Sequence, residues 1–164
     1  AALAEKLADL VNRENLDGLT VTGGEPLDQA AQLAELISEL KTRLSSSPQG
    51  DRFDVLLFSG YARSAAQRRA GALWDMLDAA VCGPYRQQLP SDVPLVASSN
   101  QEMVSLTGLA ESKYSSSHGG HRMQIVSDGE SLMMVGLPRP GELDHFASRL
   151  AQRGIELAGV SWRS

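Results

Sequence analysis

Residues 18–29 read GLTVTGGEPLDQ, and this stretch decides how the first half of the chain is interpreted. Its first part, LTVT, is rich in β-branched side chains and predicts a short buried strand. Gly23 and Gly24 end that strand, and Glu25 and Pro26 precede a sequence with helical periodicity. Proline suits the first turn of a helix and holds the preceding residue in an extended conformation. The stretch therefore predicts a strand, a tight turn and a helix, with two adjacent residues that have no side chain.

The turn at residues 23–26 has the chemistry of a site for a positively charged group. Parallel sheets place their ligands at the carboxyl ends of strands, where this turn lies. Two adjacent glycines let a ligand reach the peptide groups, and an extended Glu25 directs its carboxylate, with nearby carbonyls, at an ammonium group. Phosphate is disfavoured, because the acid would repel it and neither G-x-G-x-x-G nor the P-loop lysine is present. The alternative is an ordinary turn, although chance gives this tetrapeptide in only about a few of every thousand chains of this length.

The flanking sequence predicts alternating helices and strands. Apolar residues recur every three or four positions in residues 3–14, 27–44 and 64–77, which predicts three helices. The continuous apolar run FDVLLFSG predicts a strand covered on both faces, and DAAVCGPY predicts another strand. Strands that alternate with helices need crossover connections, so they form a parallel sheet. The expected fold class is α/β.

The second half of the chain is irregular at first and then ordered again. Residues 86–120 are rich in serine, proline and glutamine and are expected to be mostly loop. Asp128 and Gly129 separate two β-like runs and suit a tight hairpin turn, because both central positions of that turn need positive φ. Residues 140–154 predict a helix that ends at a glycine, and residues 155–162 predict a last strand.

Composition limits the class of protein. With 164 residues, of which 42% are hydrophobic, the chain is long enough for one domain and short for two. A net charge of -5 with scattered Lys and Arg argues against nucleic-acid binding, and no apolar run suits a membrane span or an export leader. The single cysteine, Cys82, excludes an internal disulfide and any metal cluster held by several thiolates of this chain alone. We therefore expect a cytoplasmic protein whose partner is a protein or a small molecule.

Several motifs, taken in order, resemble those of the radical S-adenosylmethionine (radical SAM) enzymes. GLTVTGGEPLDQAAQLAELISELK is similar to the second strand, loop and helix of that superfamily, in which this turn binds the methionine amino group of the cofactor. DVLLFSGY, LDAAVCGPYRQQL and Ser-Ser-Asn-Gln at residues 98–101 follow in the order of the activating proteins of anaerobic ribonucleotide reductase. Those proteins are small iron-sulfur enzymes similar to pyruvate formate-lyase activating enzyme. The resemblance covers residues 3–106, and residues 114–164 add no motif to it.

The resemblance implies a fold and a set of binding residues. The fold would be an incomplete parallel (β/α) barrel of the radical SAM type in a single domain, with its core at residues 1–106. Residues 114–164 would extend it with a β-hairpin, a helix and a strand. The residues implied to bind S-adenosylmethionine are Gly23, Gly24, Glu25, Pro26, Ser59, Ser98, Ser99 and Asn100. Ser59 could instead cap the following turn, whereas Asn100 is favoured because its motif has little evident packing purpose.

Two departures from that family matter. The family places a C-x-x-x-C-x-x-C loop before the glycine-rich turn, where three thiolates hold a 4Fe-4S cluster, and this chain has no such loop. Because the chain opens at Ala1 inside a helix-like sequence, we expect the cluster ligands upstream; the alternative is a protein that lacks the cluster. The second departure is Cys82, which stands where relatives have Asp and which we interpret as a buried, unreactive thiol. His118 and His121 suggest a metal pair, but no third ligand is evident and a solvated loop is favoured.

For the intact protein, the resemblance implies an activating enzyme. It would cleave S-adenosylmethionine reductively to methionine and a 5'-deoxyadenosyl radical, which abstracts hydrogen from a glycine of a partner glycyl-radical enzyme or from another substrate. An electron donor such as flavodoxin or ferredoxin would serve it, and this chain alone is expected to be inactive. Two alternatives stay open: a cluster-free binding or interaction module on the same scaffold, and a radical maturase that acts on a peptide.

Overall fold

The computed structural model describes residues 2–115, 123–127, 131–136, 141–155 and 157. Contacts within the chain divide it into two compact units, Ala1–Gly119 and Gly120–Ser164. The first unit holds a four-stranded sheet and the second holds a two-stranded hairpin and a helix. Among the described residues, no helix has both the length and the apolar character needed to span a membrane.

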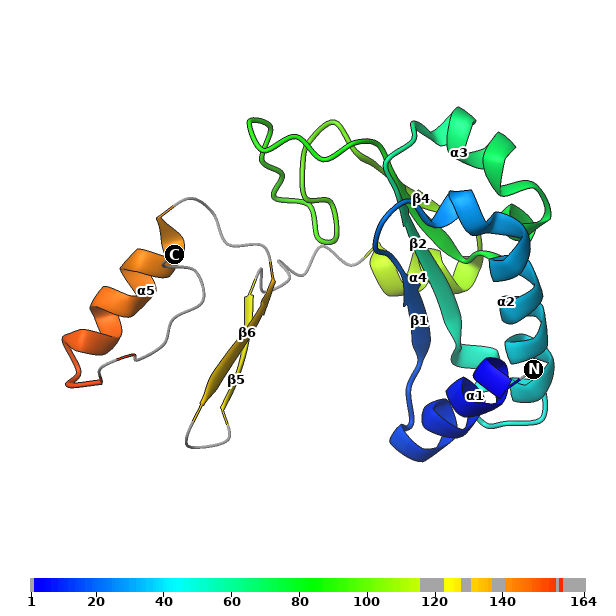
Figure 1. The fold of residues 1–164 in the computed structure, drawn as a ribbon, viewed down its shortest axis with the longest axis horizontal. Helices are drawn as coiled ribbons and strands as arrows, with labels where there is room; N and C mark the ends of the chain where they lie inside the picture. Colours follow the sequence, from blue (N-terminus) through cyan, green and yellow to red (C-terminus); the bar gives the residue numbers. More distant parts are fainter. Residues whose placement is uncertain (1, 116–122, 128–130, 137–140, 156, 158–164) are drawn as a thin grey trace. The chain divides into compact units, whose positions relative to one another are not determined.

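Three parallel strands and one antiparallel strand form the sheet of the first unit (Figure 1). In spatial order they are β1 (Gly18–Val21), β2 (Asp54–Ser59), β3 (Ala79–Cys82) and β4 (Glu102–Ser105). The parallel pairing of β1 with β2 and of β2 with β3 confirms the prediction from alternating helices and strands. β4 runs antiparallel to β3, so its amino end lies at the same edge as the carboxyl ends of the other three strands.

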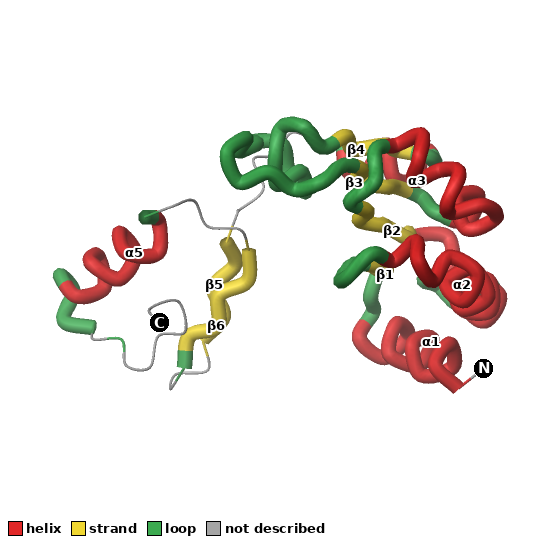
Figure 2. Tube along the Cα trace, turned by 45° about the horizontal axis from the view of Figure 1, so that its top comes forward, coloured by secondary structure: helices red, strands yellow, loops and turns green. Residues whose placement is uncertain are grey.

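Helices cover one face of this sheet (Figure 2). They are α1 (Ala2–Glu14), η1 (Pro26–Gln29), α2 (Ala30–Leu44), α3 (Arg63–Ala70) and η3 (Gly71–Met76), and the short turn η2 (Gly50–Arg52) precedes β2. The helix predicted at residues 64–77 is therefore two elements. Gly71 divides them, because its φ of +54° cannot continue an α-helix.

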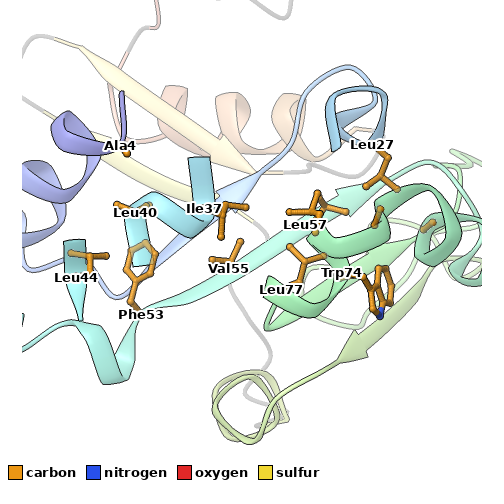
Figure 3. Close-up of a cluster of buried hydrophobic side chains, with 14 of the residues drawn as sticks. Ala4, Leu27, Ile37, Leu40, Leu44, Phe53, Val55, Leu57, Trp74 and Leu77 are labelled. Atoms are coloured by element: carbon orange, nitrogen blue, oxygen red, sulfur yellow. The ribbon is translucent and has the colours of Figure 1, made fainter. Parts of the chain in front are cut away.

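The main core lies between these helices and the sheet (Figure 3). Val55 and Leu57, at alternate positions of β2, are both 0% exposed and share one cluster with Ile37 and Leu40 of α2 and Ala4 of α1. The helical residues fall at the spacing of three or four that predicted the helices. Burial of each large aliphatic side chain contributes about 1.5 to 3 kcal/mol, so α2 is held to the sheet mainly by this contact.

The opposite face of β2 is covered as well. Leu56 is 3% exposed and clusters with Ala79, Val81 and Ala110, the last of which belongs to α4 (Gly108–Tyr114). This confirms that β2 is buried on both faces, as its continuous apolar run predicts. Residues 86–101 contain no helix or strand, as predicted, whereas β4 and α4 are two elements that the composition does not predict. Thr107 caps α4 by accepting a hydrogen bond from the Ala110 amide at 3.3 Å. Threonine is a common residue at the start of a helix, but the serine-rich composition of this segment favoured the prediction of a loop.

Two buried carboxylates stabilise the amino-terminal edge of the sheet. Asp54 is 1% exposed and accepts hydrogen bonds from Lys113 Nζ at 2.7 Å and from the Tyr114 hydroxyl. Asp78, which immediately precedes β3, accepts a hydrogen bond from the Val55 amide at 2.9 Å. Because buried charges are costly unless they are paired, these contacts fix α4 and the strand ends to one another.

The second unit contains β5 (Met123–Ser127), β6 (Leu132–Gly136) and α5 (Glu142–Ala151). The antiparallel pairing of β5 with β6 confirms the predicted hairpin, and α5 confirms the predicted helix. Gly141 precedes α5 with a φ of +82° and Gly154 follows it with a φ of +77°. The turn residues Asp128 and Gly129 and most of the predicted last strand lie outside the described residues.

Candidate functional site

The candidate residues gather at the carboxyl edge of the parallel strands. Residues 23–26 follow β1, Ser59 ends β2, and residues 98–100 lead into β4. Neighbouring strand ends are joined there, since the Gly83 amide after β3 donates to the Ser59 carbonyl at 3.0 Å. Segments that are up to 77 positions apart in the sequence thus share one edge of one sheet, the edge where parallel sheets bind ligands.

Gly23 and Gly24 form an open turn above β1. Their φ angles are +96° and +24°, in the region that residues with side chains seldom adopt. A Cβ atom built on either glycine would have no heavy atom within 4 Å. The need for glycine is therefore conformational, and the space where side chains would lie is open to an approaching ligand.

Glu25 has the extended conformation predicted for a residue before proline, with φ of -115° and ψ of 104°. Its carboxylate is engaged within the protein. Oε1 accepts hydrogen bonds from the Leu27 amide at 3.1 Å and the Ser59 hydroxyl at 3.0 Å, and Oε2 accepts one from the Gly60 amide at 2.9 Å. Glu25 therefore caps η1 and ties the turn to the end of β2. Since each carboxylate oxygen can accept two hydrogen bonds, Oε2 retains one further acceptor position.

Ser59 is 4% exposed and lies beneath this turn. Its hydroxyl donates to Glu25 and accepts a hydrogen bond from the Tyr61 amide at 3.1 Å. Of the two roles considered for Ser59, the structure therefore shows the capping of the following turn. Because this hydroxyl also holds the Glu25 carboxylate, it helps to fix the position of the glycine-rich turn.

The Ser-Ser-Asn-Gln motif closes the long loop between β3 and β4. Ser98 is 0% exposed and its hydroxyl accepts a hydrogen bond from the Arg86 amide at 3.1 Å. Ser99 and Asn100 are exposed; the Ser99 amide donates to the Leu89 carbonyl at 2.7 Å, and Asn100 Nδ2 donates to the Pro84 carbonyl at 2.7 Å. The expectation that this motif has little packing purpose is wrong, because it fastens the loop. Ser98 is enclosed by the loop, whereas Asn100 lies at its surface.

Two residues outside the predicted binding set, Gly60 and Gln101, also belong to this edge. Gly60 supplies the amide that binds Glu25, and Gln101 uses its side-chain amide to bind three main-chain groups. Gln101 is the last residue of the Ser-Ser-Asn-Gln motif, and its polar side chain next to a strand could have indicated a role in holding the loop. The sequence places Gly60 at the end of the second strand, but nothing in it shows that the Gly60 amide binds a residue 35 positions earlier.

Cys82 ends β3 and is 1% exposed. Burial raises the pKa of its thiol to about 11, and the nearby Glu102 adds to the effect. The burial confirms that part of the interpretation, and a raised pKa agrees with an unreactive thiol, because the thiolate is the reactive form. His118 and His121 lie outside the described residues.

The residues of this chain do not fit a 4Fe-4S cluster. Such a cluster takes three or four thiolate ligands, whereas the sequence has one cysteine and its thiol is enclosed in the sheet. Within the described ranges, no three His, Cys, Asp or Glu side chains are grouped so as to hold a metal ion. The edge above the parallel strands offers peptide groups, amide side chains and the carboxylates of Glu25 and Glu102, and Glu102 is paired with Arg63 at 2.8 Å. Such groups can form hydrogen bonds with an organic ligand.

Comparison with known families identifies the chain. A family model described as a 4Fe-4S single cluster domain matches residues 1–104, which span β1, β2, β3 and all but the last residue of β4. This match covers more than half of the 164 residues, so the chain belongs to that family. Neither a curated protein nor a solved structure matches the chain.

Proposed function

We propose that this chain supplies the S-adenosylmethionine-binding part of a radical SAM activating enzyme. Its sheet would be a segment of the incomplete (β/α) barrel of that superfamily, and the turn at residues 23–26 would bind the methionine end of the cofactor. Membership of a 4Fe-4S family supports the iron-sulfur setting of this proposal.

One observation carries the proposal. The Gly23–Gly24 turn is open on its outer side and is fixed on its inner side by the three hydrogen bonds to Glu25. A turn that is both rigid and open presents carbonyl oxygens to a ligand without first having to be ordered, which favours binding. The remaining acceptor position of Glu25 Oε2 adds negative charge beside them, and an ammonium group suits such a set of oxygens.

The other residues of the edge take different parts in this proposal. Asn100 and Ser99, which are exposed, are assigned to the cofactor surface, whereas Ser59 and Ser98 act by holding Glu25 and the loop. The thiolates of the 4Fe-4S cluster are assigned to residues outside these 164, because the one cysteine here does not fit that role. A cytoplasmic setting, a flavodoxin or ferredoxin as electron donor, and a glycyl-radical enzyme as partner complete the proposal.

A second candidate function rests on the same lack of thiolates. A binding or interaction module would keep the sheet and its open turn without radical chemistry. The activating enzyme and the peptide maturase share the same cofactor site, so cofactor binding separates both of them from this module.

Calorimetry with two ligands tests the proposal. S-adenosylmethionine is titrated into the purified chain, and 5'-methylthioadenosine, which lacks the amino-acid end, is titrated under the same conditions. We expect saturable binding of the first and binding of the second that is weaker by about tenfold to a hundredfold, since a charge-assisted hydrogen bond contributes about 1.5 to 3 kcal/mol. Equal affinities would remove the turn from the binding site, and absence of binding would favour the module.

A further inference from the structure

We propose that Gln101 is a positioning residue for the candidate site. Its side chain would hold the end of β3 so that the loop after β2, which binds Glu25, keeps its place. The ligand-binding part of this inference rests on the proposed function, whereas its structural part can be measured without a ligand.

Gln101 binds both ends of the loop between β3 and β4. Its Nε2 donates to the Gly83 carbonyl at 3.0 Å, and its Oε1 accepts hydrogen bonds from the Ala97 and Ser98 amides at 3.1 and 3.0 Å. All three partners are main-chain groups, which are costly to leave unpaired where water is excluded. One half-buried side chain therefore fixes the point where the loop leaves β3 and the point where it returns to β4.

Gly83, whose carbonyl accepts the hydrogen bond from Gln101, is restricted in its conformation and closely packed. Its φ is +121°, and a Cβ atom there would lie 3.2 Å from both the Asn100 carbonyl oxygen and the Gln101 Cα. The end of β3 is thus packed directly against the main chain that leads into β4. On its other side, the Gly83 amide donates to the Ser59 carbonyl at 3.0 Å.

The same contacts continue to the glycine-rich turn. Ser59 bridges Gly83 and Glu25, because its carbonyl accepts from the one and its hydroxyl donates to the other. Gly60, the next residue, donates its amide to Glu25 Oε2. Hydrogen bonds therefore join all four strand ends in one line, from Gln101 to Glu25. Such chains can act cooperatively, so loss of the first contact is expected to loosen the last.

The variant Gln101→Glu removes one hydrogen bond of this series, the one to the Gly83 carbonyl. A carboxylate keeps the size of the side chain and can still accept from the Ala97 and Ser98 amides, but it cannot donate to the Gly83 carbonyl. The matched control is Gln88→Glu, which makes the same change at an exposed glutamine of the same loop. If Gln101→Glu does not fold, Gln101→Ala is compared with Gln88→Ala in the same measurements.

Amide hydrogen exchange followed by NMR gives the structural readout. In Gln101→Glu we expect the exchange of the Gly83 and Gly60 amides to rise about tenfold relative to Gln88→Glu, with the core amides of Val55 and Leu57 unchanged. A residue that only stabilises the loop would leave Gly60 unaffected. Equal exchange at Gly60 in both variants therefore overturns the inference.

Calorimetry with S-adenosylmethionine gives the functional readout. We expect Gln101→Glu to weaken binding by about fivefold while Gln88→Glu binds as the unaltered chain does. If the unaltered chain binds and both variants match it, the positioning role is wrong although the proposed function stands. If the unaltered chain does not bind, the proposed function fails and the exchange at Gly60 alone decides the role of Gln101.

Discussion

The Glu25 carboxylate accepts a hydrogen bond from the Gly60 amide at 2.9 Å, which joins the turn after β1 to the turn after β2. The acid that the sequence suggests as a partner for a ligand is thus first of all a partner for the protein. Two further donors, the Leu27 amide and the Ser59 hydroxyl, share the same carboxylate. Through these contacts, Glu25 joins the open glycine turn to η1 and to the end of β2, and we expect the position of the turn to depend on this side chain.

Replacement of Glu25 by Gln tests that dependence. An amide side chain has one acceptor oxygen and a donor group in place of the second oxygen, so it cannot satisfy all three donors. We expect the free energy of unfolding to fall by about 1 to 3 kcal/mol, the effect of a lost hydrogen bond to a charged group. Urea unfolding measures it, with Glu35→Gln at an exposed position of α2 as the control. Equal stability of the two variants would mean that the three contacts do not hold the turn.

Replacement of Gly23 or Gly24 by Val tests the open side of the turn. Both positions have positive φ, so strain is expected in the variants, and the new side chain would occupy the space assigned to the cofactor. Gly71→Val is the matched control, because Gly71 also has positive φ and open surroundings but lies after α3. We expect all three variants to lose stability and only the first two to lose S-adenosylmethionine affinity, by about tenfold or more. Loss of affinity in Gly71→Val as well would point to strain rather than to a binding turn.

Much of the sheet could be predicted because its signals are local. The apolar run that became β2 and the glycines that end β1 each act within a few residues, and the parallel order follows from the crossovers. β4 was missed because it has four residues, of which only Val104 is buried, and it is stabilised by pairing with β3 rather than by its own pattern. The pairing of β4 with β3 therefore determines its strand conformation, although the local composition favours a loop.

The location of the candidate site could be predicted from the sequence, but the hydrogen bonds that hold it together could not. Gly23 and Gly24 were identified from the turn itself, and the structure adds their positive φ. The contacts of Glu25 with Gly60 and of Gln101 with Gly83 join residues 35 and 18 positions apart. Main-chain donors and acceptors have the same chemistry at every residue, so no sequence pattern marks which of them such a side chain will bind.

Alkaline pH is expected to destabilise the first unit. Burial lowers the pKa of Lys113, but its hydrogen bonds and charge contacts with Asp54 and Asp17 outweigh this and hold the pKa above its ordinary value. Burial, followed by the hydrogen bond to Asp54, raises the pKa of Tyr114. The folded state therefore retains protons that the unfolded chain releases above about pH 10, so the free energy of unfolding falls as pH rises through that range.

Urea unfolding at a series of pH values measures this effect. Tyr114→Phe should show a shallower decline above about pH 10, since one of the groups that retain a proton in the folded state is absent. Tyr85→Phe, at a residue that is 60% exposed, is the control and should decline as the unaltered chain does. An identical pH dependence in both variants would exclude Tyr114 as a source of the effect.

Reconstitution with iron and sulfide tests where the cluster ligands lie. The chain has one cysteine, and its buried thiol cannot replace the three that a 4Fe-4S cluster requires. After anaerobic reconstitution and desalting we expect no stoichiometric cluster absorbance, and the same result for Cys82→Ala. A full cluster on the unaltered chain, lost in Cys82→Ala, would contradict the assignment of the ligands to other residues.

The central claim is that the turn at residues 23–26 binds the amino-acid end of S-adenosylmethionine, and NMR titration of the chain labelled with nitrogen-15 tests it most directly. The account predicts saturable shifts of the Gly23, Gly24 and Leu27 amides with S-adenosylmethionine, and much smaller shifts of these amides with 5'-methylthioadenosine. Saturable shifts confined to other parts of the chain, or no shifts at these three amides at saturating ligand, would contradict it.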